Sequence, residues 1–154
     1  MTDQLPLALT LRHAPRLEDF IVGDNAVVLA AIRQLLSVGT EHLVFLSGPS
    51  GSGRTHLLSG LCAAGTDRGL RCAYLPLRER DDLAPELLEG LERLDLVAVD
   101  DVMLAAGAPE WEHALFHLFN RCREAGTRLL FSADRALPLC HWPCRTCAPA
   151  WHGA

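Results

Sequence analysis

A glycine-rich segment carries the clearest chemistry in the sequence. Residues 47–56 read Ser-Gly-Pro-Ser-Gly-Ser-Gly-Arg-Thr-His, and they fit the pattern Gly-x-x-x-x-Gly-Lys-Ser/Thr except that Arg54 stands in place of lysine. Glycines let a backbone approach a ligand closely, and successive N–H groups before the positive end of a helix attract phosphate. We therefore predict a phosphate-binding loop in which Thr55 supplies a hydroxyl to Mg2+.

The substitution at Arg54 bears on what the loop can do. Arginine keeps the positive charge, but its guanidinium is larger and planar, so it positions phosphate differently from lysine. Nucleotide binding, with weak or no intrinsic hydrolysis, is the resulting expectation. The alternative is an ordinary turn, because Gly-Pro-Ser-Gly is also a turn sequence. The flanking pattern favours the phosphate loop, since an apolar run at 42–46 precedes it and leucines at helical spacing follow it.

Carboxylates end a second apolar run. Asp100 and Asp101 follow residues 94–99, which places them at the sheet edge where ligands of open α/β folds bind. One carboxylate there can hold Mg2+ beside the phosphates, and the other can orient an attacking water. The alternative is that both residues begin a loop or cap a helix. Asp134 follows another apolar run, where it could sense a γ-phosphate through water or lie in a solvated loop.

Composition sets limits on the function. With 154 residues and 49% hydrophobic content, the chain can bury one good core. Its net charge of −5 argues against a surface that binds DNA by bulk electrostatics. No apolar run has membrane-spanning length and no signal peptide is evident, so we predict a cytoplasmic protein without a membrane partner. Cysteines 62, 72 and 122 lie in apolar patterns typical of buried free thiols.

Strand-like and helix-like patterns alternate along the chain. Strands are expected at residues 42–46, 72–75, 94–101 and 127–132. Helices are expected from Asp24 or Asn25 to about Gly39, after the glycine-rich loop, from Pro85 behind an Asp81-Asp82 cap, and from Pro109. Strands that are apolar on both faces and separated by helices predict an α/β fold, a parallel sheet with helices on both faces.

Taken together, these motifs resemble the AAA+ domain of the bacterial replication initiator DnaA, a P-loop NTPase. The resemblance rests on residues 20–25, 48–56, 99–101 and 132–135. The closer likeness is to the Hda family, short DnaA homologues that lack a DNA-binding domain and inactivate the initiator. Two features favour Hda beyond the early start of the domain: the arginine in the loop, and residues 4–9, which are similar to the clamp-binding motif of Hda. From the residues alone, that hexapeptide is either a mobile leader or an extended docking peptide.

The resemblance also implies roles for individual residues. The residues implied to bind the nucleotide, ADP or ATP, are Gly48, Pro49, Ser50, Gly51, Ser52, Gly53, Arg54, Thr55 and His56. Phe20 and Val22 are implied to lie near the adenine. Asp100 and Asp101 are the implied Walker B pair, Asp134 is the sensor, and Thr55 and Asp100 hold Mg2+. The sliding clamp is expected to contact Gln4, Leu5, Leu7 and Leu9.

The resemblance implies a role in regulating the initiation of chromosomal replication. Hda-like proteins bind ADP and, with the clamp on DNA, stimulate ATP hydrolysis by DnaA, so DNA is contacted only indirectly. Asp101 departs from the pattern, because many active AAA+ ATPases use glutamate there. A DnaC-like helicase loader or another P-loop ATPase is the alternative. A P-loop kinase would need a lid with several arginines, for which Arg78, Arg80 and Arg135 are the candidates.

Three regions follow from this interpretation: residues 1–16, a leader with the clamp-binding-like peptide; 17–138, the AAA+ core; and 139–154, an atypical tail. Family members continue after the fourth strand with a fifth strand, an arginine finger and a helical lid. The tail instead gathers cysteine, histidine and tryptophan. We hypothesise that it is a frameshifted end, which leaves the fifth strand and lid absent and the strand at 42–46 at an edge. A metal site at Cys144 and Cys147 and a neutral tail are the alternatives.

Overall fold

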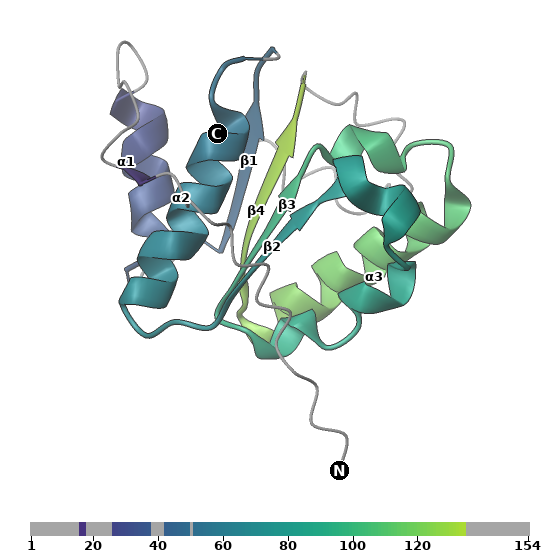
Figure 1. Cartoon of the computed structure of the whole chain (residues 1–154). Coiled ribbons are helices and arrows are strands. Elements are labelled where there is room, and N and C mark those ends of the chain that lie inside the picture. Colours follow the sequence, from purple (N-terminus) through teal and green to yellow (C-terminus); the bar gives the residue numbers. More distant parts are fainter. Residues whose placement is uncertain (1–15, 18–25, 38–41, 50, 135–154) are drawn as a thin grey trace.

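The computed structural model describes residues 16–17, 26–37, 42–49 and 51–134. In these residues a four-stranded parallel sheet has helices on both faces (Figure 1). The strands are β1 (Leu43–Ser47), β2 (Cys72–Pro76), β3 (Leu96–Asp100) and β4 (Arg128–Ala133). The predicted α/β class is therefore confirmed. Predictions for residues 1–15, 20, 22, 50 and 135–154 lie outside the described residues.

The strand order brings distant motifs to one edge of the sheet. The order is β1-β4-β3-β2, so the last described strand lies between the first and third strands. Ser47 is paired with Ala133, and Pro76 with Asp100. Because the strands are parallel, their carboxyl ends share one edge, where the glycine-rich loop and Asp100 meet. Among the described strands β1 and β2 lie at the two edges of the sheet.

Two helices, α1 (Ala26–Gln34) and α2 (Arg54–Asp67), cover one face of the sheet (Figure 1). Leu29 and Ile32 of α1 are buried, and α2 buries three leucines at helical spacing. The prediction that the first helix runs to Gly39 was wrong. The α-helix ends at Gln34, and tighter turns follow in which the amide of Leu35 donates to the carbonyl of Ile32. Leu35 and Leu36 remain buried in these turns.

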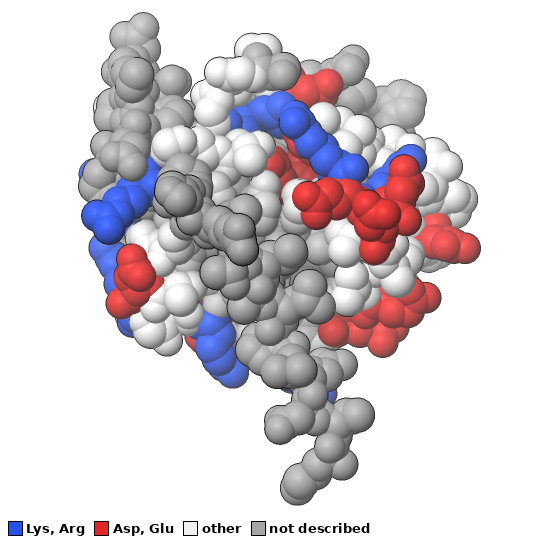
Figure 2. Space-filling model, viewed as in Figure 1, with Lys and Arg blue, Asp and Glu red and all other residues white. Residues whose placement is uncertain are grey.

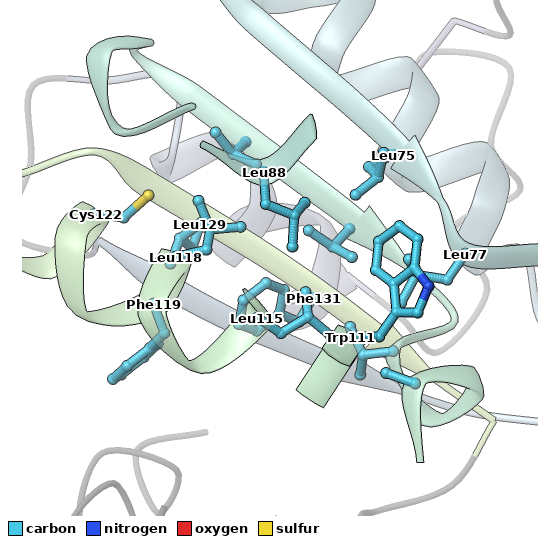
Figure 3. Packing of buried hydrophobic residues seen from close by; sticks show 14 of the residues in the cluster. Leu75, Leu77, Leu88, Trp111, Leu115, Leu118, Phe119, Cys122, Leu129 and Phe131 are labelled. Carbon is cyan, nitrogen blue, oxygen red and sulfur yellow. The ribbon is translucent and has the colours of Figure 1, made fainter. Parts of the chain in front are cut away.

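Helix α3 (Pro109–Ala125) covers the opposite face. Its buried side chains are those that the sequence pattern grouped on one side: Trp111, Leu115, Leu118, Phe119 and Cys122 (Figure 3). Proline suits the first turn, where its missing N–H is not needed, and Gly126 ends the helix with φ of 76°. The amphipathic pattern and both end signals therefore predicted this helix correctly.

The segment between β2 and β3 differs from the expectation. Three short 3-10 helices, η2 (Leu77–Asp82), η3 (Pro85–Leu88) and η4 (Leu91–Arg93), stand where one short α-helix was predicted. Proline does begin η3. Five residues later, Gly90 has φ of 87° and interrupts the helical conformation. The segment is too short for a stable α-helix between these two residues. Another 3-10 turn, η5 (Val102–Ala105), follows β3.

None of the described helices is both long enough and apolar enough to cross a membrane.

Candidate functional site

The glycine-rich loop connects the carboxyl end of β1 to the first turn of α2. The amide of Gly48 donates to the carbonyl of Ala133 at 3.2 Å, which ties the loop to the end of β4. A Cβ at Gly48 would lie only 2.8 Å from Oγ of Ser52, so a side chain there would displace the Ser52 side chain. Gly53 precedes α2 with φ of 90°, a conformation that favours glycine. The loop thus directs the amino end of α2 toward the edge of the sheet.

The loop and the third strand meet through Thr55 and Asp100. The Thr55 hydroxyl donates to Oδ2 of Asp100 at 2.6 Å, and the Tyr74 hydroxyl donates to the same oxygen at 2.8 Å. Ser132 donates to Oδ1. Asp100 is almost fully buried. Burial and the neighbouring Asp100 charge raise the pKa of Tyr74, so its hydroxyl stays a protonated donor.

A carboxylate beside a threonine hydroxyl is the oxygen donor set that Mg2+ prefers. Thr55 and Asp100 therefore fit the predicted metal ligands by chemistry and by proximity.

Asp101 engages two arginines. Arg54 Nη1 donates to Oδ1 at 2.9 Å, and Arg78 Nε donates to Oδ2 at 2.6 Å. Asp101 is 1% exposed and Arg54 6% exposed. The backbone at Asp101 has φ of 56°, which is uncommon for a residue other than glycine, and its amide donates to Oγ of Ser132 at 2.9 Å. The loop arginine thus lies against the sheet, paired with the second carboxylate.

The other predicted residues stand in different relations to this cluster. Asp134 directly follows β4 at the same edge of the sheet and is half-buried. His56 lies in the first turn of α2, where its Nε2 is 2.9 Å from the carbonyl oxygen of Arg16. That contact places the ring toward the segment before α1. The structure therefore brings Arg54 and Thr55 into direct contact with the two carboxylates.

Three residues of the cluster received no role from the sequence: Tyr74, Arg78 and Ser132. Tyr74 offered a signal, because it is the sole tyrosine and stands in an otherwise apolar strand. Ser132 was part of a motif, but its contact with Asp100 depends on β4 pairing with β3. Arg78 was considered only for a kinase lid. Its position depends on η2, which the sequence did not predict.

The family follows from a comparison with known proteins. The family profile described as "Bacterial DnaA ATPAse domain" matches residues 11–139. The chain belongs to this family. The sequence-based resemblance to DnaA is thereby confirmed, and the DnaA family accounts for both the phosphate-loop motif and the parallel sheet.

Solved structures agree with membership of the DnaA family. Replication initiator DnaA bound to AMPPCP and single-stranded DNA is similar with a TM-score of 0.75 at 24% identity, over 91% of this chain and 48% of that chain. AMPPCP-bound DnaA from Aquifex aeolicus has a TM-score of 0.71 at 26% identity, over 79% of this chain and 42% of that chain. This chain therefore spans less than half of either DnaA chain. A structure of the DnaC helicase loader shares the fold, with a TM-score of 0.59 at 15% identity, over 80% of this chain and 78% of that chain.

Proposed function

We propose that this chain binds ADP or ATP at residues 48–56, with Mg2+ held by Thr55 and Asp100. The observation that carries the proposal is the 2.6 Å contact between the Thr55 hydroxyl and Asp100, which joins the glycine-rich loop to the end of β3. The amino end of α2 and the Arg54 guanidinium supply positive charge beside the loop. Bound Mg2+ would neutralise charge on the phosphates. Two DnaA structures carrying AMPPCP support the choice of nucleotide.

The geometry supports binding more than hydrolysis. A carboxylate that orients an attacking water needs an oxygen that faces the water. Each oxygen of Asp101 accepts a hydrogen bond from a positively charged arginine, which makes this carboxylate a weaker acceptor for a proton of the water. Asp101 is also one methylene shorter than the glutamate expected at this position. We therefore propose weak or no intrinsic ATP hydrolysis, with Asp134 near the γ-phosphate as a sensor.

For the wider role, we propose an Hda-like regulator of replication initiation in the cytoplasm. In this role the chain promotes ATP hydrolysis by the initiator DnaA together with the sliding clamp, which binds Gln4, Leu5, Leu7 and Leu9. Membership of the DnaA family and the arginine in the loop support this proposal.

The surface charge supports indirect contact with DNA. Figure 2 shows acidic side chains gathered over the η2 and η3 side, beside a band of basic side chains near the carboxyl ends of the strands. Exposed acidic residues of this segment are Glu79, Asp81, Asp82, Glu86 and Glu89. These acidic side chains repel the phosphate backbone.

A helicase loader is the second candidate, because DnaC and DnaI structures share the fold. A loader of this kind needs contacts with single-stranded DNA. Gel-shift measurements with a single-stranded oligonucleotide separate the two roles, since direct binding by this chain alone would favour the loader.

The test of nucleotide binding is an equilibrium titration of the purified chain with labelled ADP and ATP, with and without Mg2+. Arg54→Ala should abolish or strongly weaken binding. Asp100→Asn should weaken mainly the Mg2+-dependent part. Arg93→Gln, which removes a positive charge at an exposed position of η4, is the matched control and should bind normally. A folded wild-type chain that binds neither nucleotide would contradict the proposal.

The regulatory role needs its own experiment. Purified DnaA loaded with ATP is incubated with clamp-loaded DNA and this chain, and the release of phosphate is measured. Replacing Leu5 and Leu7 with alanine should remove stimulation and clamp binding together while nucleotide binding stays unchanged. Stimulation that persists without the clamp would contradict the Hda-like role.

A further inference from the structure

Arg78 shares Asp101 with the loop arginine. Its Nε lies 2.6 Å from Oδ2 of Asp101, while Nη1 of Arg54 lies 2.9 Å from Oδ1. The two arginines differ in exposure: the Arg54 side chain is 7% exposed, whereas that of Arg78 is 63% exposed. One buried carboxylate thus links a buried arginine of the phosphate loop to a surface arginine that follows β2.

The other carboxylate of the pair takes no part in this linkage. Asp100 accepts hydrogen bonds from three hydroxyls, those of Thr55, Tyr74 and Ser132. Asp101 is therefore the carboxylate that competes with a phosphate group for Arg54. A carboxylate and a phosphate bind the same donors of a guanidinium. A strong bond from Arg54 to Asp101 therefore lowers the affinity of Arg54 for phosphate.

The charge on Asp101 is divided between two donors. A donor on Oδ2 draws electron density from the carboxylate and neutralises part of its charge, which weakens the attraction at Oδ1. The hydrogen bond to Asp101 raises the pKa of Arg78, as expected for a close pair. The uncommon φ of 56° at Asp101 presents the carboxylate to both arginines, and such a conformation persists only where its surroundings fix it.

We propose that Arg78 is a positioning residue that sets nucleotide affinity through Asp101. By binding Oδ2 of Asp101, Arg78 weakens the hold of this carboxylate on Arg54 and leaves Arg54 available to phosphate. The inference rests on the proposed nucleotide site, but it assigns to Arg78 a role without contact with the nucleotide. It also changes the role expected of Asp101, which becomes a competitor for the loop arginine.

The test is a double-mutant cycle in which the affinity for labelled ADP is measured. Arg78→Gln should weaken binding by about two- to fivefold, the range that an exposed ion pair produces. Arg78→Lys should restore part of this loss. Asp101→Asn should tighten binding by at least about fivefold, because a buried arginine without its counter-charge favours an anion. In the Asp101→Asn background, Arg78→Gln should have no further effect.

The cycle separates this role from two others. If Arg78 contacted phosphate directly, Arg78→Gln would weaken binding equally in both backgrounds, and the proposal would be overturned. If Arg78 acted only through overall charge, Arg93→Gln in η4 would have the same effect, which also overturns it. No binding of ADP by the wild-type chain would overturn the proposed function itself. Binding without coupling between Arg78 and Asp101 would overturn this inference alone.

A second measurement needs no variant at Asp101, whose loss could prevent folding. Phenylglyoxal modifies exposed arginines, and mass spectrometry locates the modified residues in the wild-type chain. ADP should leave the modification of Arg78 unchanged or increase it, since Arg78 does not contact the nucleotide. Protection of Arg78 by ADP would show direct contact and contradict the proposal.

Discussion

The hydroxyl of Tyr74 donates a hydrogen bond of 2.8 Å to Oδ2 of Asp100 and so joins β2 to the carboxylate at the end of β3. The same oxygen accepts from Thr55 in the first turn of α2. A single buried carboxylate therefore links the phosphate loop, the third strand and the second strand. The stability of the folded chain and the geometry of its site depend on the same hydrogen bonds.

Tyr74→Phe removes one donor from this carboxylate and nothing else. Asp100 is 2% exposed, so water cannot replace the lost hydrogen bond easily. We expect the free energy of unfolding to fall by about 1.5–3 kcal/mol, the range for hydrogen bonds to charged groups. Urea denaturation followed by tryptophan fluorescence measures it. Val27→Ala, at an 81% exposed position of α1, is the control, and equal stability of the two variants would contradict the assignment.

The core between α3 and the sheet gives a second prediction. Leu118 is fully buried against β4 and the 3-10 segment, whereas Leu87 in η3 is 38% exposed. Leu118→Ala should lower the free energy of unfolding by about 2–5 kcal/mol, because it removes buried methyl groups and leaves a cavity. Leu87→Ala is the matched control and should cost less than about 1 kcal/mol. Equal losses in urea denaturation would show that the packing in Figure 3 is wrong.

The sequence predicted the elements of the fold well where its pattern was periodic. The period of α3 identified its buried face, from Trp111 to Cys122, and the four apolar runs coincide with the four strands to within two residues. The phosphate loop was recognisable because glycine and hydroxyl residues stand at fixed spacing. A motif of this kind consists of residues that are adjacent in the sequence, so a single sequence is enough to identify it.

What the sequence could not predict depends on contacts between distant residues. The insertion of β4 between β1 and β3 brings Ser132 to Asp100, and no local pattern specifies that order. The 3-10 turns of η2 place Arg78 at Asp101, although only Pro85 and Gly90 hint at an interrupted helix. The pairing of Arg54 with Asp101 likewise spans 47 positions of the chain.

The close packing of α2 on β2 gives a third prediction. A Cβ at Gly65 would lie 2.6 Å from Sγ of Cys72, and its next neighbours are at ordinary distances. Gly65→Ala should therefore destabilise the chain by about 1–3 kcal/mol through overpacking, despite the better helix propensity of alanine. Cys72→Ala removes the sulfur atom, so the double variant should be more stable than the sum of the single effects predicts. Additive effects in urea denaturation would contradict this contact.

Because of the buried thiols, the stability of the folded chain should fall with rising pH in the alkaline range. Burial raises the pKa of Cys122 from 9.0 to about 11 and that of Cys62 from 9.0 to about 12. Both thiols stay protonated in the folded chain, whereas in the unfolded chain they lose protons near pH 9. The unfolded state thus binds fewer protons above pH 9, and stability falls as pH rises toward the folded pKa values.

For Cys122 this loss should be about 1.4 kcal/mol per pH unit between pH 9 and 11. Urea denaturation of the wild-type chain and of Cys122→Ala at pH 8 and pH 10.5 measures it. The variant is less stable at pH 8 because it loses buried contacts, but its further loss at pH 10.5 should be smaller than that of the wild-type chain. An identical pH dependence in the two proteins would mean that the Cys122 thiol ionises as readily in the folded chain as in the unfolded one.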